Sequence, residues 1–287
     1  MNSTTLTLNG TPHSFEAGET LLDVATRAGE EIMTLCHDPR LKPVGACRTC
    51  LVEIKGVRRL APSCMTKAEA GMEVIISNER IERHQKALLA LYMSDNVSLD
   101  ETGGSADPSQ MHQMAEDVGA PTDWPAMKSL RADRKADRNP YIEYRSELCI
   151  LCARCTRYCE EVESVSAITL SGRGAATTIS TVDSRSLLDT SCELCGGCID
   201  VCPTGAMTEK KPLALALRPN KELAKIRTTC NYCGVGCRWI SMSIARPELV
   251  RGLSLRLPRR VQALCPMTAT CVSKVALRIN SSTIQTG

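Results

Sequence analysis

The sequence has 287 residues, which is room for two or three modest domains. Aromatic residues make up only 3% of it, with a single Phe, which is poor material for large aliphatic–aromatic cores. The net charge of +3, taken over the whole chain, selects no class of partner. Cysteine is the unusual component, because the chain contains 17.

The spacing of the cysteines argues against a secreted, disulfide-bonded protein. Most of them lie two or three residues apart, too close for the usual bridge geometry. The N-terminus MNSTTLTLNG lacks the pattern of a signal peptide, and no apolar run approaches the roughly 20 residues of a membrane span. We therefore expect a cytoplasmic chain without membrane insertion, whose thiolates bind metal in a reducing compartment.

Residues 1–78 predict a small β-grasp domain. In TLTLNGTPHSF, the apolar alternation around Asn9-Gly10 predicts a β-hairpin. Thr20 and Asp23 resemble a capping box, which begins a helix over LLDVATRA. Two further strands are predicted in CLVEIKGVRRLAPSC and one in MEVIIS. Strands around one helix are typical of a β-grasp ferredoxin, and the expected fold class of the chain is α+β.

The cysteines of this domain indicate a [2Fe-2S] cluster. The segment GACRTC resembles the loop of plant-type ferredoxins, although the preceding gap has ten residues instead of four. Gly45 and Ala46 are small enough for backbone N–H groups to approach the cluster sulfurs, which stabilises the reduced state. The alternative is a set of buried or zinc-bound cysteines. The expected ligands are Cys36, Cys47, Cys50 and Cys64.

Residues 79–138 predict a helix and a connector. Asn78 is a candidate N-cap for a helix over ERIERHQKALLALYMSD. The stretch from Asp95 to Asp137 is rich in Gly, Ser, Pro and Asp, which predicts an irregular connector.

Residues 139–212 contain an internal repeat with the pattern C-x2-C-x2-C-x3-C, which is typical of bacterial [4Fe-4S] sites. A tight loop places three thiolates around one face of a cubane, and the fourth thiolate comes from the other run. A pair of zinc sites is the alternative, but zinc usually takes ligands as two pairs and would leave one cysteine of each run unexplained. We assign one cluster to Cys149, Cys152, Cys155 and Cys202, and the other to Cys192, Cys195, Cys198 and Cys159.

Residues 225–287 begin with a third cysteine motif, CNYCGVGC, in which Gly234 and Gly236 allow a tight backbone. A zinc knuckle or unmetallated thiols are the alternatives to a further [4Fe-4S] cluster. The cluster needs a fourth ligand downstream, either Cys265 or Cys271. The candidate ligands are Cys230, Cys233, Cys237 and Cys265.

Catalytic residues are not predicted anywhere in the chain. It contains no Ser/His/Asp set, Walker loop or G-x-G-x-x-G motif. His37 and His84 are interpreted as surface or packing residues. SGRGAATT, which begins at Ser171, has the wrong spacing for a phosphate loop and predicts a hairpin between the two cysteine runs.

The order of these motifs resembles one family of redox proteins. NPYIEYRSELCILCARCTRYCEEV, CELCGGCIDVCPTGAMTEK and TTCNYCGVGC cover about residues 139–238. They are similar to the N-terminal third of the α subunit of cytoplasmic, NAD-dependent molybdenum or tungsten formate dehydrogenases. They are also similar to the large iron–sulfur subunit of NADH:quinone oxidoreductase, but TTC-Y-CGVGC favours the formate dehydrogenase branch. The resemblance implies that CNYCGVGC holds the [4Fe-4S] cluster beside the molybdopterin cofactor.

Two departures from that family stand out. Asn96 occupies the position of a histidine that, with three cysteines, usually binds a further cluster, and no cysteine lies between Cys64 and Cys149. We expect that cluster to be absent, because His112 cannot replace four ligands. The family also continues with a fourth cysteine in LCVKGRF and a long molybdopterin-binding portion.

The tail of this chain differs from that continuation. From Ile240 onward it has seven Lys or Arg residues and one acidic residue, Glu248. We hypothesise that the reading frame has slipped here, because a shifted frame can encode LCVKGRF; Cys265 would then be an accidental cysteine. On this hypothesis the segment is a truncated molybdopterin-oxidoreductase domain, and the chain itself does not bind molybdopterin.

The expected function is an electron-transfer module of a formate dehydrogenase, between flavin/NAD-binding diaphorase-type subunits and a molybdopterin site on a separate polypeptide. Alternatives are the iron–sulfur subunit of an NADH:quinone oxidoreductase or a hydrogenase diaphorase, and a non-catalytic truncated product. A cluster-based nucleic-acid sensor is a further alternative. Nucleic acid is not expected as a partner, because the basic tail has no aromatic residue after Trp239 to stack on bases.

Overall fold

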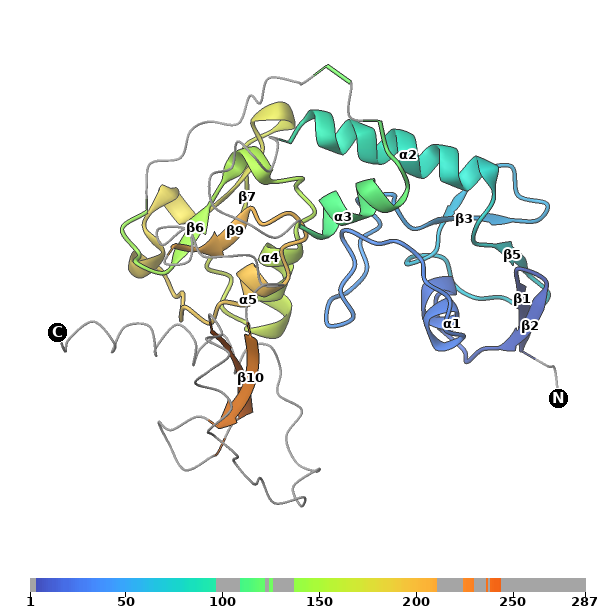
Figure 1. The fold of residues 1–287 in the computed structure, drawn as a ribbon, viewed down its shortest axis with the longest axis horizontal. Helices are drawn as coiled ribbons and strands as arrows, with labels where there is room; N and C mark the ends of the chain where they lie inside the picture. Colours follow the sequence, from blue (N-terminus) through green and yellow to red (C-terminus); the bar gives the residue numbers. More distant parts are fainter. Residues whose placement is uncertain are drawn as a thin grey trace.

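The structure is a computed structural model of the chain, and it describes residues 4–96, 109–121, 124–125, 137–210, 224–229, 236 and 238–243. A small sheet lies at the N-terminal end, and the cysteine-rich segment lies at the other end of an elongated molecule (Figure 1). Helix α2 (Glu79–Ser94) extends between them. Over the described residues, every helix is too short or too polar to cross a membrane.

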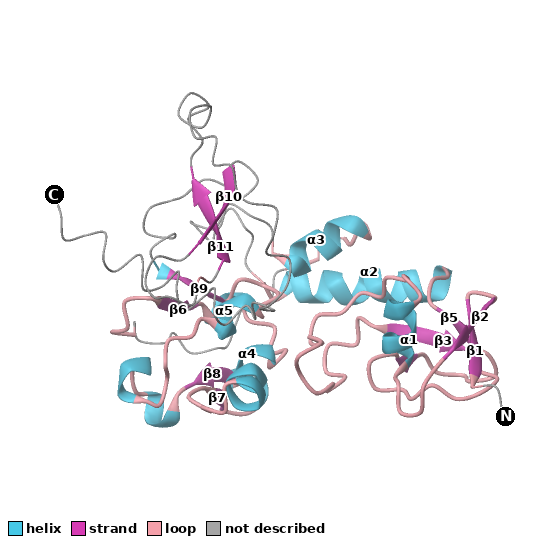
Figure 2. Ribbon diagram, turned by 90° about the horizontal axis from the view of Figure 1, so that it is seen from below, coloured by secondary structure: helices cyan, strands magenta, loops and turns pink. Residues whose placement is uncertain are grey.

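The N-terminal sheet has five strands in the order β2-β1-β5-β3-β4. Strands β1, β2, β3 and β5 lie close to helix α1 (Leu21–Arg27) at the N-terminal end of the molecule (Figure 2). Strands β1 and β5 are parallel, and the other neighbouring strands are antiparallel. This mixed sheet with a helix against it matches the predicted β-grasp pattern. Its strands are β1 (Thr5–Leu8), β2 (Thr11–Ser14), β3 (Leu51–Ile54), β4 (Ala61–Pro62) and β5 (Glu73–Ile75).

Local sequence explains how this domain is built. Asn9 and Gly10 both have positive φ, at 48° and 86°, as the tight turn between β1 and β2 requires. Helix α1 (Leu21–Arg27) begins with the predicted capping box, in which Thr20 and Asp23 each accept a hydrogen bond from the other's backbone N–H. Its apolar face packs against the sheet through a buried cluster that includes Leu21, Val24, Ala25, Leu8, Val52 and Val74.

Helix α2 begins as predicted, because the Asn78 side chain accepts a hydrogen bond from the N–H of Ile81 at 2.9 Å. The prediction of an irregular connector after it was wrong in part, since this region contains helix α3 (Gln110–Asp117), capped by Ser109. Met111 and Met114 bury α3 beside Leu89 of α2. The compositional signal for a connector missed these apolar contacts, because they form only in the tertiary structure.

The cysteine-rich domain consists of short elements joined by tight loops. Two antiparallel pairs of strands join β6 with β9 and β7 with β8, and the second is the hairpin predicted in SGRGAATT. A buried core beneath them includes Ile142, Leu148, Tyr158, Ile179 and Val201. The elements are β6 (Ile142–Tyr144), α4 (Arg154–Arg157), a π-helical turn (Tyr158–Val162), β7 (Thr169–Ser171), β8 (Thr178–Ser180), α5 (Gly197–Asp200) and β9 (Met207–Glu209).

Strands β10 (Ala224–Thr229) and β11 (Arg238–Ser243) pair in an antiparallel ladder from Ala224 opposite Ser243 to Thr229 opposite Arg238. In the sequence they flank the CNYCGVGC motif, of which only Gly236 is described, with φ of 70°. The other predicted site residues of this segment lie outside the described residues, namely Cys230, Cys233, Gly234, Cys237, Cys265 and Cys271.

Helix α5 lies so close to Tyr158 that its first residue must be small. A Cβ atom on Gly197 would lie 2.0 Å from Cε1 of Tyr158, whose side chain is 1% exposed and cannot move aside without disturbing the core. We predict that Gly197→Ala destabilises the protein by about 1–3 kcal/mol. Denaturant unfolding of the full chain measures this, with the exposed Ser171→Ala in β7 as the control, expected within about 0.5 kcal/mol of wild type. Equal stability of the two variants would contradict this packing.

Candidate metal centres

The four cysteines assigned to the [2Fe-2S] site come together in the N-terminal domain. Cys36 lies in the long loop after α1, Cys47 and Cys50 lie in the loop that leads into β3, and Cys64 follows β4. All four side chains are buried, with exposed fractions of 0% to 4%. Buried thiols far from any charge are inert, so these cysteines can bind metal only if their surroundings favour thiolates.

The four sulfurs form two couples of neighbouring thiols, Cys36 with Cys47 and Cys50 with Cys64. The N–H of Cys36 donates to Sγ of Cys47 at 3.3 Å, and the N–H of Cys47 donates back to Sγ of Cys36 at 3.5 Å. Sγ of Cys50 and Sγ of Cys64 lie 3.4 Å apart. The side-chain hydrogen bond with Cys36 lowers the pKa of Cys47 to about 5, and the one with Cys64 lowers the pKa of Cys50 to about 6. One thiolate of each couple is therefore favoured, and each couple could serve one iron of a two-iron cluster.

The loop before Cys47 follows the predicted pattern of small residues. Gly45 has φ of 60°, and a Cβ there would lie 2.9 Å from Cγ of Met65. The conformation therefore favours glycine, whereas the contact alone does not require it, because the exposed Met65 side chain can move aside. The side-chain hydrogen bond with Cys47 and then burial raise the pKa of Cys36, and the backbone N–H of Ala46 opposes this rise through its interaction with the Cys36 sulfur. Backbone donors thus surround the sulfurs, as they do in iron–sulfur sites.

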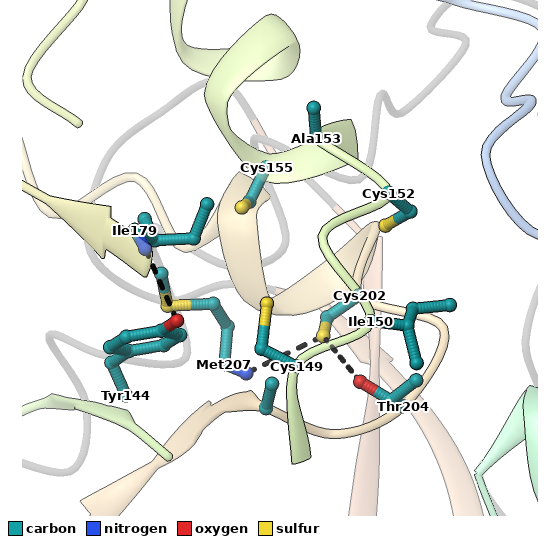
Figure 3. A pocket seen from close by; sticks show the side chains of 11 residues that line it. Tyr144, Cys149, Ile150, Cys152, Ala153, Cys155, Ile179, Cys202, Thr204 and Met207 are labelled. Carbon is teal, nitrogen blue, oxygen red and sulfur yellow. Dashed lines mark hydrogen bonds between the residues drawn. The ribbon is translucent and has the colours of Figure 1, made fainter. Parts of the chain in front are cut away.

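Four cysteines from the two runs line one cavity in the second domain. Cys149, Cys152 and Cys155 belong to the first run, and Cys202 belongs to the second. Their sulfurs face a common space (Figure 3). This is the ligand set predicted for the first cubane by the crossed assignment, in which each run of cysteines gives three ligands to one cluster and the fourth to the other. The remaining wall is largely apolar and includes Tyr144, Ile150, Ala153, Ile179, Ala206 and Met207.

Backbone N–H groups point at the sulfurs of this first set. Leu151 donates to Cys149 and Met207 donates to Cys202, each at 3.4 Å. The loop closes tightly because Leu151 and Ala153 adopt the left-handed conformation, with φ of 56° and 58°. Such donors stabilise thiolate ligands and compensate for the strained loop.

The second set repeats this arrangement. Leu194 donates to Cys192 at 3.4 Å, and Ala167 donates to Cys159 at 3.3 Å. Burial raises the pKa of Cys198, and the neighbouring thiol charges that raise it further are, in order, Cys195, Cys192, Cys159 and Cys202. The three thiols of the second run therefore lie near Cys159 of the first run, as assigned. The Gly197 N–H also donates to Cys195 at 3.4 Å.

The three cysteine sets adjoin one another. Burial and then the charges of Cys202, Cys152 and Cys198 raise the pKa of Cys155, so the two cubane sets are neighbours. Cys152 in turn packs against the buried cluster that contains Cys36 and Cys47. Clusters held by the three sets would therefore be close neighbours.

Tyr92 of α2 lies at the contact between the first two sets. Its hydroxyl donates to the Cys47 carbonyl at 3.1 Å. Burial raises its pKa, and the charges of Cys47, Cys36 and Cys152 raise it further. Nothing in the sequence identified Tyr92, since a tyrosine on an amphipathic helix looks like an ordinary core residue.

The donor sets therefore fit iron–sulfur clusters in the described part of the chain, where every cysteine is a free thiol. The fit rests on buried thiols, converging N–H donors and a cavity lined by four sulfurs from two loops. Across those same residues, no three His, Cys, Asp or Glu side chains form a site for a single metal ion. Asn96 is buried, and its side-chain amide donates to the Leu148 carbonyl at 3.0 Å.

Two sequence families match parts of the chain. Residues 2–79 match the 2Fe-2S iron-sulfur cluster binding domain. Residues 139–208 match the NADH-quinone oxidoreductase subunit 3, ferredoxin-like domain. The chain therefore carries a [2Fe-2S] cluster-binding domain and a ferredoxin-like [4Fe-4S] domain in this order.

Similar proteins are subunits of multi-subunit oxidoreductases. An NADH-quinone oxidoreductase subunit of Rhizobium meliloti is 35% identical over 82% of this chain. The alpha subunit of an NADPH-Fe(3+) oxidoreductase of Geobacter sulfurreducens is 33% identical over 81% of it. In each case the match spans 27% of the relative, so the chain corresponds to about a quarter of those proteins.

Two hydrogenases are also similar. The HndD subunit of an NADP-reducing hydrogenase of Solidesulfovibrio fructosivorans is 31% identical over 73% of this chain and 36% of its own length. A chain in the crystal structure of an NAD+-reducing [NiFe]-hydrogenase in the H2-reduced state superposes with a TM-score of 0.65. That match has 28% sequence identity and covers 73% of this chain and 88% of the hydrogenase chain.

The crossed ligand sets make a testable prediction. Cys202→Ala and Cys155→Ala should abolish the same [4Fe-4S] cluster, because these two sulfurs line one cavity although they are 47 positions apart in the sequence. Each variant should lose about four iron atoms per chain. Cys159→Ala should remove the other cubane and leave the first. If Cys202→Ala and Cys198→Ala instead removed the same cluster, the crossed assignment would be wrong. Iron analysis and EPR of the reduced proteins distinguish these results.

Proposed function

We propose that this chain, which carries iron–sulfur domains of the kind found in NADH-quinone oxidoreductases and NAD(P)-linked hydrogenases, is an electron-transfer module of a multi-subunit oxidoreductase. The observation that carries the proposal is the proximity of the three cysteine sets: Cys152 packs against the buried cluster that contains Cys47, and Cys155 lies near Cys198. Iron–sulfur clusters bound there would supply one-electron transfer. We assign the clusters to the three described ligand sets.

The protein's own residues would contribute position, shielding and charge stabilisation. Burial of Cys36, Cys47, Cys50 and Cys64 keeps water from the first centre. Backbone donors such as Leu151 and Met207 hold ligand sulfurs in place. Because these donors stabilise negative charge on sulfur, they favour the reduced state. The apolar wall around Tyr144 and Ile179 lowers the local dielectric, which strengthens each of these interactions.

The finer proposal is that the module belongs to a formate dehydrogenase. It is supported by the motif at residues 230–237, which resembles the cluster segment beside the molybdopterin in that family. The chain would then exchange electrons between a flavin/NAD-binding subunit and a molybdopterin polypeptide. Its proposed location is a reducing compartment such as the cytoplasm, in keeping with the free thiols of the described cysteines.

A second candidate is the iron–sulfur subunit of a hydrogenase diaphorase. The specific observation in its favour is the TM-score of 0.65 to a chain of an NAD+-reducing [NiFe]-hydrogenase, most of which is covered by the match. Both candidates share a flavin/NAD-binding partner and differ in the partner at the other end. Affinity purification from the source cells separates them, according to whether a molybdopterin protein or a hydrogenase protein accompanies the chain.

Anaerobic reconstitution tests the module itself. We predict about ten iron atoms per chain for one [2Fe-2S] and two [4Fe-4S] clusters, and about four more if residues 230–237 also hold one. Cys47→Ser should remove only the [2Fe-2S] EPR signal, because its ligands come from a separate domain. The isolated chain should not reduce dyes with formate. Failure of the wild-type chain to take up iron and sulfide would refute the proposed function.

A further inference from the structure

Arg157 is a buried cation at the meeting point of the cysteine sets. It lies on α4 between Cys155 and Cys159, and only 8% of it is exposed. Its Nη2 donates to the Cys36 carbonyl, and its Nη1 donates to the Lys42 carbonyl. The guanidinium therefore joins the helix of the [4Fe-4S] domain to the loop that carries a [2Fe-2S] ligand.

Nearby arginines have carboxylate partners, whereas Arg157 has none in the described part of the chain. Arg154 contacts Asp38 at 3.1 Å, and Arg40 contacts both Asp38 at 2.9 Å and Asp200 at 3.0 Å. Among the described residues, Arg157 is bonded only to the two carbonyl oxygens, and its Nε is buried without a partner. A buried charge is costly unless an opposite charge compensates it.

The cysteine sets are the groups near Arg157 whose negative charge could compensate its positive charge. Arg157 is two residues from Cys155 and two from Cys159, which belong to the two cubane sets, and it is bonded to the backbone of Cys36. Clusters held by four thiolates carry net negative charge, and a one-electron reduction adds another unit. A fixed cation in a low-dielectric interior acts strongly on such charges.

We propose that Arg157 is the built-in counter-cation of the iron–sulfur centres, and that it raises the reduction potential of the [2Fe-2S] cluster held by Cys36. This inference rests on the proposed function, since it requires the clusters. Arg157 acts through charge and through the Cys36 backbone, and is therefore a positioning residue that also tunes the potential. Asp38 has the opposite effect, because its buried carboxylate belongs to the same loop and is 4% exposed.

An EPR-monitored redox titration of the full chain tests this, with dithionite as the reductant and dye mediators. Arg157→Gln keeps hydrogen-bond donors but removes the charge, and should move the [2Fe-2S] midpoint potential to a more negative value. Arg157→Lys keeps the charge and should restore most of the shift. Asp38→Asn should move the potential in the positive direction.

Gln110→Ala is the matched control for loosened packing. Gln110 crosses the same contact, since its Nε2 donates to the Thr34 carbonyl at 3.0 Å and its Oε1 accepts from Arg154 at 3.0 Å, but it carries no charge. Its removal should leave the midpoint potential at the wild-type value.

Three results would overturn the inference: an unchanged potential in Arg157→Gln, an equal shift in Gln110→Ala, or a negative shift in Asp38→Asn. If Arg157→Gln does not take up the cluster, Asp38→Asn decides alone, and absence of a positive shift contradicts the charge effect. Absence of a [2Fe-2S] signal in the wild-type chain would instead refute the proposed function.

Discussion

The convergence of buried thiols from separate loops is the constraint on which the rest of this structure depends. Cys202 lines the cavity of the first run because α5 packs beside α4. This close packing is possible because Gly197 has no side chain that would clash with the Tyr158 ring. Unscreened thiolates would repel one another in such an interior. N–H donors from the strained loops offset part of that repulsion, and bound iron would offset the remainder. Short helices and hairpins suffice around such a centre, because the metal–thiolate bonds organise the chain.

Contacts between the two domains hold the cysteine sets in place relative to one another. The loop of residues 35–42 is held by Arg154 and Arg157 of α4, and through Arg40 by Asp200 of α5. The Arg40 guanidinium also lies 5.1 Å from the centre of the Tyr158 ring. Desolvation offsets much of the stability that buried polar contacts of this kind could add, but they join the two domains at defined residues. They fix the separation of the cysteine sets, on which the rate of electron transfer between centres depends.

Much of the site could be predicted from the sequence, since cysteine spacing is a direct consequence of cluster geometry. The turn at Asn9-Gly10 and the Asn78 cap could also be predicted from the sequence, because each depends on a few neighbouring residues. Helix α3 and Tyr92 were not, since their role depends on packing between distant segments. Arg154 and Arg157 stand inside CARCTRYC, but a motif does not reveal which carbonyls or carboxylates its cations meet.

X-ray absorption spectroscopy at the iron edge of the reconstituted full chain tests this account most directly. Clusters in the assigned sites predict iron surrounded by sulfur, together with the short iron–iron distances of sulfide-bridged centres. Sulfur-ligated metal ions with no iron–iron scattering, or zinc in place of iron, would show that the thiols hold isolated ions and would contradict the account.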